Sequence, residues 1–144
     1  MKVGGILETA LSVTDPAASA AFYRRLFGFE TLLDTDRLVA LNVAGRDVLL
    51  LFRKGATQEA AAVPGGVIPP HGASGESHLA FSVTEDDLKA WEARLATEGV
   101  SVESVVTWPG GARSVYFRDP DRHLVELISP GFWAVYRPAR ARTG

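Results

Sequence analysis

Two acids and a histidine stand out in this sequence because each lies inside or at the start of an apolar, strand-like run. They are Glu8, His78 and Glu126. Carboxylates and imidazoles exchange protons, accept hydrogen bonds and bind cations. Each residue also has an ordinary explanation, as a surface acid, a hydrogen-bonded histidine at a strand start, or a glutamate that meets water on a sheet edge. The elements that position the three residues decide between these interpretations.

A short pattern in the chain recurs after 70 positions, where Leu11-Ser12-Val13-Thr14-Asp15 returns as Phe81-Ser82-Val83-Thr84-Glu85. Both copies lie between a run with strand-like alternation and a run with helical spacing. The same shift aligns Glu8 with His78. Similarly, Val48-Leu49-Leu50-Leu51 aligns with Leu124-Val125-Glu126-Leu127, which pairs Leu50 with Glu126. The two halves are therefore predicted to be structural repeats.

Each half is predicted to contain one strand, one helix and three further strands. In the first half, Pro16 suits the first turn of a helix and Gly28 suits its end. In the second half, Thr84 is the predicted N-cap and Gly99 the end of the helix. Alternation predicts the strands 6–13, 30–34, 37–43 and 46–53, then 79–83, 100–107, 112–117 and 123–128.

This order predicts an α+β fold in which two βαβββ modules form curved mixed sheets around a shared cleft. We expect a single domain that consists of a module at 5–53, a linker or surface loop at 54–77, a module at 78–129 and a C-terminal tail at 130–144. The 54–77 segment is rich in Gly, Ala and Pro. A loop of this length often covers a site.

Composition restricts the partners. The formal charge is −2 and basic residues form no stripe, which disfavours nucleic acid. The sequence has no cysteine, which excludes disulfides and thiolate chemistry. No apolar run is long enough for a membrane span and the N-terminus lacks a signal-peptide core, so we expect a cytoplasmic protein without membrane partners. The basic cluster of Arg137, Arg140 and Arg142 is expected to be a solvated tail.

Two motifs resemble those of a known superfamily. Asp15-Pro16, Phe22-Tyr23 and Leu26-Phe27-Gly28-Phe29 resemble its opening segment, and Phe117-Arg118-Asp119-Pro120-Asp121-Arg122-His123-Leu124-Val125-Glu126-Leu127 resembles its closing strand pair. Across about residues 5–129 the chain is similar to the vicinal oxygen chelate superfamily, which includes glyoxalases, bleomycin-resistance proteins and dioxygenases. The fold hosts many chemistries, so the resemblance leaves the individual activity open.

The resemblance implies a metal site at four repeat-related positions, which are Glu8, Leu50, His78 and Glu126 in this sequence. Leucine cannot bind a metal, so three ligands remain. One nitrogen and two carboxylates suit a divalent transition metal, namely Mn²⁺, Fe²⁺, Zn²⁺ or Ni²⁺, with positions left for water or substrate. The expected function is a metal-dependent enzyme, a lyase or dioxygenase, that acts on a small oxygen-chelating substrate. A homodimer is also implied.

The chain departs from the better-known members at two of these positions. Glu8 replaces a more usual His or Gln, and Leu50 removes the carboxylate that glyoxalase I-like members use, which disfavours that activity. Extradiol dioxygenases generally use two histidines and a nearby tyrosine, and the direction of Tyr116 is left open by alternation. Fosfomycin-resistance transferases use three ligands, again with His at the position of Glu8, and need cation-binding loops that the sequence does not reveal.

Two further functions compete with the enzyme. A metal-free protein could sequester a bulky cationic molecule in an aromatic groove made by Trp108, Phe117 and Trp133, with Glu8 and Glu126 as plain charges. Alternatively, the loss of a ligand at Leu50 could mark a protective or regulatory protein with a degenerate site.

Alternation and residue type suggest which side chains line the cleft and which do not. Glu8, Ala10 and Ser12 share one strand face, as do His78, Ala80 and Ser82. Trp91 is expected in the core, His123 is expected to be structural, His71 has no predicted role, and Trp133 and Tyr136 could fold over a site or pack at a dimer interface. The predicted substrate-binding residues are Ser12, Asn42, Ser82, Trp108, Arg113 and Phe117.

Overall fold

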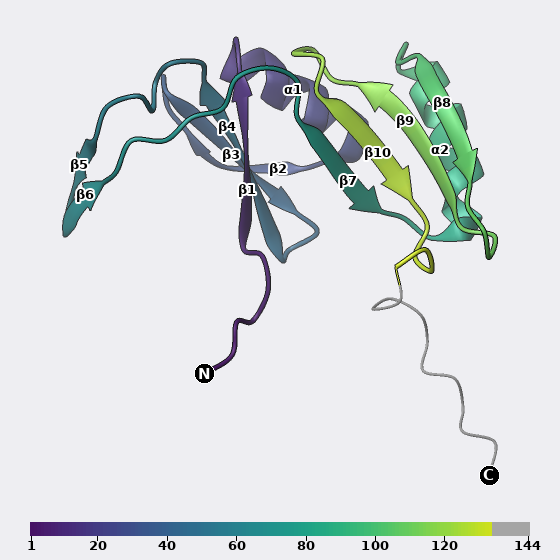
Figure 1. The fold of residues 1–144 in the computed structure, drawn as a ribbon. Helices are drawn as coiled ribbons and strands as arrows, with labels where there is room; N and C mark the ends of the chain where they lie inside the picture. The colour runs from purple at the N-terminus through teal and green to yellow at the C-terminus, as the bar shows by residue number, and fades with distance from the viewer. Residues whose placement is uncertain (134–144) are drawn as a thin grey trace. The chain divides into compact units, whose positions relative to one another are not determined.

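The computed structural model describes residues 1–133 of the 144-residue chain. Tyr136 and the arginines of the tail lie outside the described residues. The chain forms two compact units, one at Met1–Ser77 and one that starts at His78. Each unit contains a four-stranded mixed sheet with one helix, which confirms the predicted pair of βαβββ modules (Figure 1).

The first unit contains β1 (Glu8–Val13), α1 (Pro16–Phe27), β2 (Glu30–Asp34), β3 (Leu38–Val43) and β4 (Asp47–Arg53). Its sheet has the order β1-β4-β3-β2, with β1 parallel to β4 and the other neighbours antiparallel. Helix α1 packs on β3 and β4 and buries Phe22, Tyr23 and Leu26. Leu11, Val39 and Leu51 complete the core on the helix side of the sheet.

Both ends of α1 are held by local interactions, and the helix begins at the predicted Pro16 and ends before the predicted Gly28. The Asp15 carboxylate accepts hydrogen bonds from the backbone N–H groups of Ala17 (2.9 Å) and Ala18 (3.2 Å). Gly28 adopts a left-handed conformation with φ of 73° and its N–H donates to the Arg24 carbonyl. Such a conformation favours glycine because a side chain would clash with the backbone.

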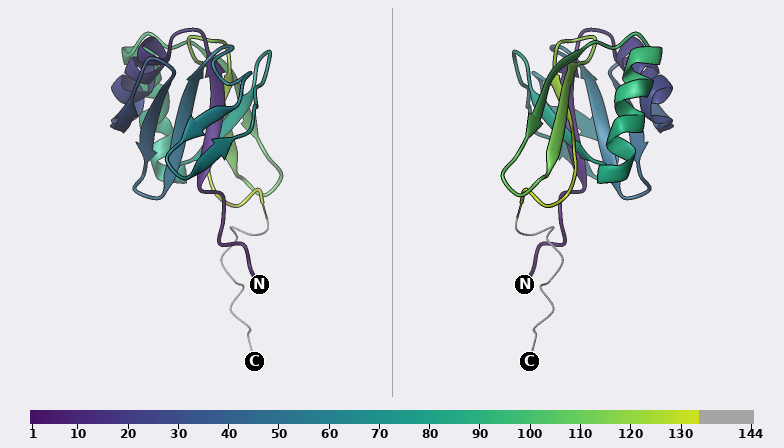
Figure 2. Two further views of the ribbon diagram at one scale, coloured as in Figure 1. Left: turned by 90° about the vertical axis from the view of Figure 1, so that its left-hand side faces the viewer. Right: turned by 90° about the vertical axis from the view of Figure 1, so that its right-hand side faces the viewer.

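The second unit repeats this arrangement with β7 (His78–Ser82), α2 (Glu85–Thr97), β8 (Val102–Thr107), β9 (Arg113–Arg118) and β10 (Leu124–Ile128). The sheet order is β7-β10-β9-β8, and β7 is parallel to β10. Figure 2 shows α2 lying along one face of this sheet. Leu88 and Leu95 of α2 are fully buried, together with Val115, Phe117, Val125 and Leu127.

The segment 54–77 differs from the predicted linker because it contains a β-hairpin. Strand β5 (Ala61–Val63) pairs with β6 (Gly66–Ile68) through a tight turn at Pro64-Gly65. Gly65 has φ of 100°, which few residues other than glycine adopt. The predicted strands themselves are correct to within two residues at each end. Within the described residues, no helix is long and apolar enough to cross a membrane.

We predict that Asp15→Ala lowers the free energy of unfolding by about 1 kcal/mol, because two N–H groups at the start of α1 lose their acceptor. Asp15→Asn keeps a side-chain oxygen at the same place and should lose only a fraction of that. Urea denaturation followed by circular dichroism measures both. Equal losses in the two variants would show that the carboxylate does not act as the cap.

Candidate functional site

In the second unit, the strand register brings three functional side chains onto one face of the sheet. Glu126 lies on β10, between Ala80 of β7 and Tyr116 of β9. His78 is two residues from Ala80 along β7, and alternate residues of a strand face the same side. The His78 Nε2 and Glu126 Oε2 atoms are consequently 3.1 Å apart.

The two atoms of this contact are held in place by further hydrogen bonds. His78 Nδ1 lies 3.1 Å from the carbonyl oxygen of Leu124, and since a carbonyl only accepts, Nδ1 carries the proton. Tyr116 donates its hydroxyl to Glu126 Oε1 at 2.8 Å. The Glu126 side chain is only 7% exposed, whereas that of His78 is 51% exposed. The pair therefore has a buried carboxylate and an imidazole that is open to solvent.

The chemistry of this pair fits a bound cation. With the proton on Nδ1, a neutral imidazole directs the lone pair of Nε2 at a carboxylate oxygen that also only accepts. Two such acceptors at 3.1 Å repel each other unless a positive charge lies between or beside them. A proton on Nε2 or a metal ion supplies that charge. Fixing one ring nitrogen on a backbone carbonyl is also how proteins orient a histidine that binds a metal.

Tyr116 belongs to a chain of polar groups on this face. Burial raises the pKa of the Tyr116 phenol above its usual value, and the hydrogen bond to Glu126 and its negative charge act in the same direction, while a hydrogen bond with Ser114 opposes them. The phenol thus stays protonated at neutral pH and remains a donor. Trp108 Nε1 donates to Ser114 Oγ at 2.7 Å, so the chain runs from Trp108 through Ser114 and Tyr116 to Glu126.

Tyr116 and Ser114 were not among the predicted site residues. The sequence does place them on one strand face by alternation, but it does not reveal the register that sets Tyr116 opposite Glu126. Trp108, which was predicted to bind substrate, does lie beside this face, where its ring is 4.5 Å from that of Phe132. Trp133 is 61% exposed and its ring is 4.9 Å from that of Phe132.

The positions of Arg113 and Phe117 correct the expectation that they face a ligand. Phe117 is fully buried opposite Val125, on the side of the sheet that α2 covers. Arg113 faces the same side and its guanidinium contacts Glu92 of α2 at 3.1 Å. The apolar packing of α2 decides this orientation, so neither residue belongs to the site that we propose. His123 is fully buried, in agreement with a structural role.

The three other predicted substrate-binding residues have mixed surroundings. The Asn42 side-chain oxygen accepts a hydrogen bond from Gly45 N at 2.8 Å, which stabilises the β3–β4 turn. Ser12 is half-buried on β1 opposite Phe52, and Ser82 is exposed on β7 opposite Ile128. Their role in binding stays a prediction.

In the first unit, Glu8 is exposed at the start of β1 and lines a pocket on its sheet. The register repeats that of the second unit, since Ala10 pairs with Leu50 as Ala80 pairs with Glu126. Leu50 is thus the structural equivalent of Glu126, and Glu8 that of His78. Among the described residues, no group of three or more His, Asp or Glu side chains comes together as a metal site. The structure brings His78 and Glu126 into contact, whereas Glu8 belongs to the first unit.

Comparison with known proteins settles the family. The model of the glyoxalase/bleomycin resistance protein/dioxygenase superfamily matches residues 5–127. The chain belongs to this superfamily. The resemblance to vicinal oxygen chelate proteins is thereby confirmed.

Individual relatives differ in their named activities. The crystal structure of a lactoylglutathione lyase from Agrobacterium tumefaciens is 36% identical, covers 93% of this chain and 99% of its own, and superposes with a TM-score of 0.85. A metallothiol transferase FosB from Bacillus licheniformis is 28% identical over 88% of this chain and 75% of its own length. The fosfomycin resistance protein FosX from Listeria monocytogenes, at 21% identity and a TM-score of 0.67, shares the fold over 91% of this chain and 97% of its own.

We predict that Tyr116→Phe lowers the free energy of unfolding by about 1–3 kcal/mol, because the buried Glu126 carboxylate loses a hydrogen-bond donor. Chemical denaturation of the wild type, both single variants and the Tyr116→Phe/Glu126→Gln double variant gives the coupling between the two side chains. A coupling energy of zero would mean that the hydrogen bond does not contribute to stability.

Proposed function

We propose that this protein is a divalent-metal-dependent enzyme of the superfamily, acting on a small molecule that binds the metal through a pair of oxygen atoms. The observation that carries the proposal is the 3.1 Å contact between His78 Nε2 and Glu126 Oε2, with the other ring nitrogen of His78 fixed on the Leu124 carbonyl. Family membership supports the proposal, and one relative in the family is named a metallothiol transferase.

His78 and Glu126 would bind the metal directly, and we propose Glu8 as the third ligand. Glu8 is the repeat equivalent of His78, and its carboxylate is exposed. Leu50, at the equivalent of Glu126, offers no donor atom. One imidazole and two carboxylates suit Mn²⁺, Fe²⁺, Zn²⁺ or Ni²⁺. We also propose that the protein forms a homodimer. Glu8 would then come either from the same chain as His78 and Glu126 or from the second copy.

When bound, such a metal would supply a Lewis acid for the oxygen pair or lower the pKa of a bound water. Other groups of the protein would orient the two side chains that bind the metal. Tyr116 holds one oxygen of Glu126 and leaves the other for the metal, while the Leu124 carbonyl fixes the ring of His78. The indole of Trp108, anchored on Ser114, would border the bound molecule and limit access of water.

We predict about one divalent ion per chain after incubation with Mn²⁺, and a loss of affinity of at least about 100-fold in His78→Ala, because a missing ligand costs no less than a missing outer-shell partner. Isothermal titration calorimetry with MnCl₂ measures the affinity, and elemental analysis of protein purified without a metal-affinity tag gives the stoichiometry. His71→Ala is the matched control, since His71 occupies none of the four repeat-related ligand positions. Failure of Mn²⁺, Fe²⁺, Ni²⁺ and Zn²⁺ to bind the wild type would refute the metal-dependent function and favour a protein that sequesters a small molecule.

The third ligand has a separate test. Glu8→Gln removes the negative charge with little change in shape and should weaken Mn²⁺ binding by about tenfold or more. Glu59→Gln is the control. Glu59 is also exposed and lines the same pocket as Glu8, but it is not the repeat equivalent of His78 or of Glu126. Equal effects of the two substitutions would assign Glu8 a general electrostatic role only.

A further inference from the structure

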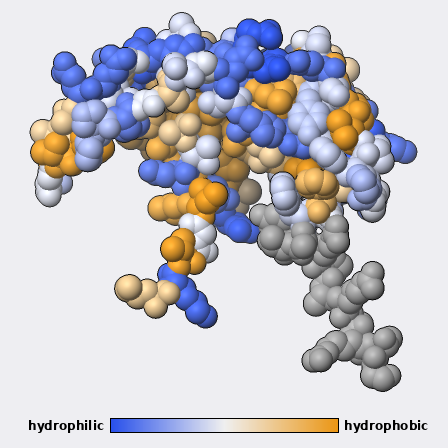
Figure 3. All heavy atoms as spheres, viewed as in Figure 1, coloured by the Kyte–Doolittle hydropathy of each residue, from blue (hydrophilic) through white to orange (hydrophobic). Residues whose placement is uncertain are grey.

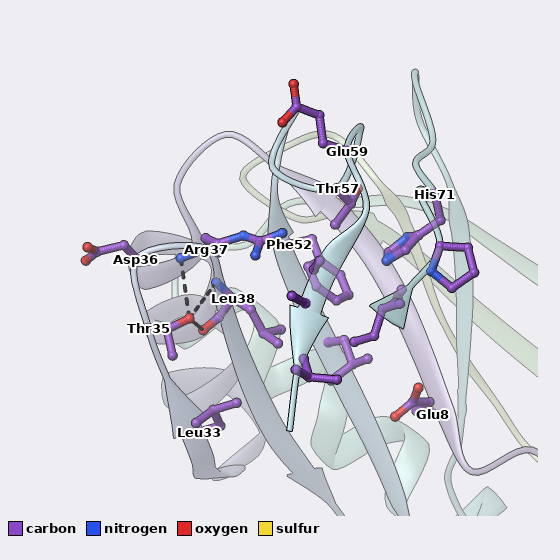
Figure 4. Close-up of a pocket in the computed structure, with 17 residues that line it drawn as sticks. Glu8, Leu33, Thr35, Asp36, Arg37, Leu38, Phe52, Thr57, Glu59 and His71 are labelled. Atoms are coloured by element: carbon purple, nitrogen blue, oxygen red, sulfur yellow. Dashed lines mark hydrogen bonds between the residues drawn. The ribbon is translucent and has the colours of Figure 1, made fainter. Parts of the chain in front are cut away.

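A large pocket lies on the sheet of the first unit, beneath the β5–β6 hairpin (Figure 4). Its volume is about 1020 Å³. Ligand pockets for drug-sized molecules have volumes of roughly 300–1,000 Å³, so this one has room for a multi-ring molecule rather than a compound of two or three carbons. All the residues that line it belong to the first unit.

The body of the pocket is apolar. Its floor is formed by Ala10 of β1 and by Leu38, Leu50 and Phe52 of β3 and β4, and its cover by residues 61–63 and 68 of the hairpin. The hairpin keeps apolar side chains at the surface, with Val63 42%, Val67 64% and Ile68 47% exposed, and Figure 3 shows hydrophobic residues gathered there. Contact between the exposed apolar side chains of the hairpin and an apolar molecule would remove both from water, which is favourable.

Two aromatic rings line one side of the pocket. Phe52 and His71 meet edge to face, with ring centroids 5.0 Å apart and planes at 78°. Both line the pocket (Figure 4), Phe52 from strand β4 and His71 from the segment that follows the hairpin. A planar aromatic molecule extends such an arrangement because aromatic rings attract one another in edge-to-face or offset geometry. His71, which had no predicted role, thus becomes part of a site.

The charges of the lining disfavour anions. Glu8, Asp36 and Glu59 carry negative charges, and among the described lining residues Arg37 is the single side chain with a permanent positive charge. The Arg37 guanidinium donates to the Ala56 carbonyl at 2.5 Å, which engages it in holding the segment after β4. Figure 4 shows the Asp36 and Glu59 side chains directed away from the pocket, so an anionic group inside it would meet the Glu8 carboxylate with little compensation.

We propose that the first unit binds a bulky, aromatic molecule without negative charge beneath the β5–β6 hairpin. Its ring system would pack between the Phe52–His71 pair and the floor around Ala10. The pocket reaches Glu8, so an oxygen pair on the same molecule would lie at the metal. That last part rests on the proposed function, whereas the apolar pocket does not depend on it.

The proposal is tested with 2-naphthol as the probe, by isothermal titration calorimetry in the presence of EDTA. We expect phenol to bind about tenfold more weakly, because it lacks the second ring and buries roughly 50 Å² less apolar surface. Naphthalene-2-sulfonate, of similar size but anionic, should also bind at least tenfold more weakly. Failure of 2-naphthol to bind the wild type would overturn the proposal, and equal affinity for the sulfonate would overturn its charge preference.

Two variants locate the bound probe. Ala10→Phe fills the floor of the pocket from an exposed position and should abolish 2-naphthol binding without lowering the unfolding midpoint. The matched control Ala18→Phe adds the same group at an exposed position on α1, outside the pocket, and should leave binding unchanged. His71→Ala removes one ring of the pair and should weaken binding. Unaltered binding in both pocket variants would place the probe elsewhere and sink the proposal.

The metal is examined separately with naphthalene-2,3-diol, which carries an oxygen pair on the same ring system. If the diol binds in EDTA and binds more tightly with Mn²⁺, both the pocket and the proposed function are supported. Binding in EDTA with no gain from Mn²⁺ would leave the pocket proposal standing and overturn the placement of a metal-binding oxygen pair at Glu8, while failure of Mn²⁺ itself to bind would refute the proposed function alone.

Discussion

The parallel pairing of β1 with β4 and of β7 with β10 is the constraint on which the rest of the structure depends. In each four-stranded sheet, β4 or β10 lies inside, between the parallel first strand and an antiparallel neighbour. This placement lets a residue such as Glu126 be flanked from two sides, by His78 on β7 and Tyr116 on β9. Because side chains alternate between faces, a shift of the register by one residue would turn the carboxylate towards α2 and expose the core.

The same scaffold serves opposite purposes in the two units. In the second, the face that lies away from the helix is polar, and its buried carboxylate is compensated by a phenol and an imidazole. Burial of a carboxylate is unfavourable unless it is hydrogen-bonded or paired with a positive charge, so this face is suited to a cation. In the first unit, Leu50 occupies the equivalent position and the face becomes the floor of an apolar pocket. The first unit thus presents an apolar surface on this face, whereas the second presents a polar one.

The β5–β6 hairpin shows how a short element can escape sequence reasoning. Its strands have three residues each and lie in a segment rich in Gly, Ala and Pro, which is typical of a loop. Alternation over three residues carries little information. The turn residues Pro64 and Gly65 are visible in the sequence, but only the pairing of Ala61 with Ile68 and Val63 with Gly66 identifies them as a hairpin. The element matters because it covers the pocket.

The sequence by itself determined the repeated βαβββ architecture, the ends of both helices, and the strand faces that carry Glu8, His78 and Glu126. These features follow from local patterns, since capping residues act within one turn and alternation acts within one strand. Only the tertiary structure decided that Tyr116 donates to Glu126, that Arg113 contacts Glu92, and that His71 packs on Phe52. These contacts join residues 10 to 21 positions apart along the chain, and their partners are set by strand register and by helix packing. Local residue patterns carry no direct record of either.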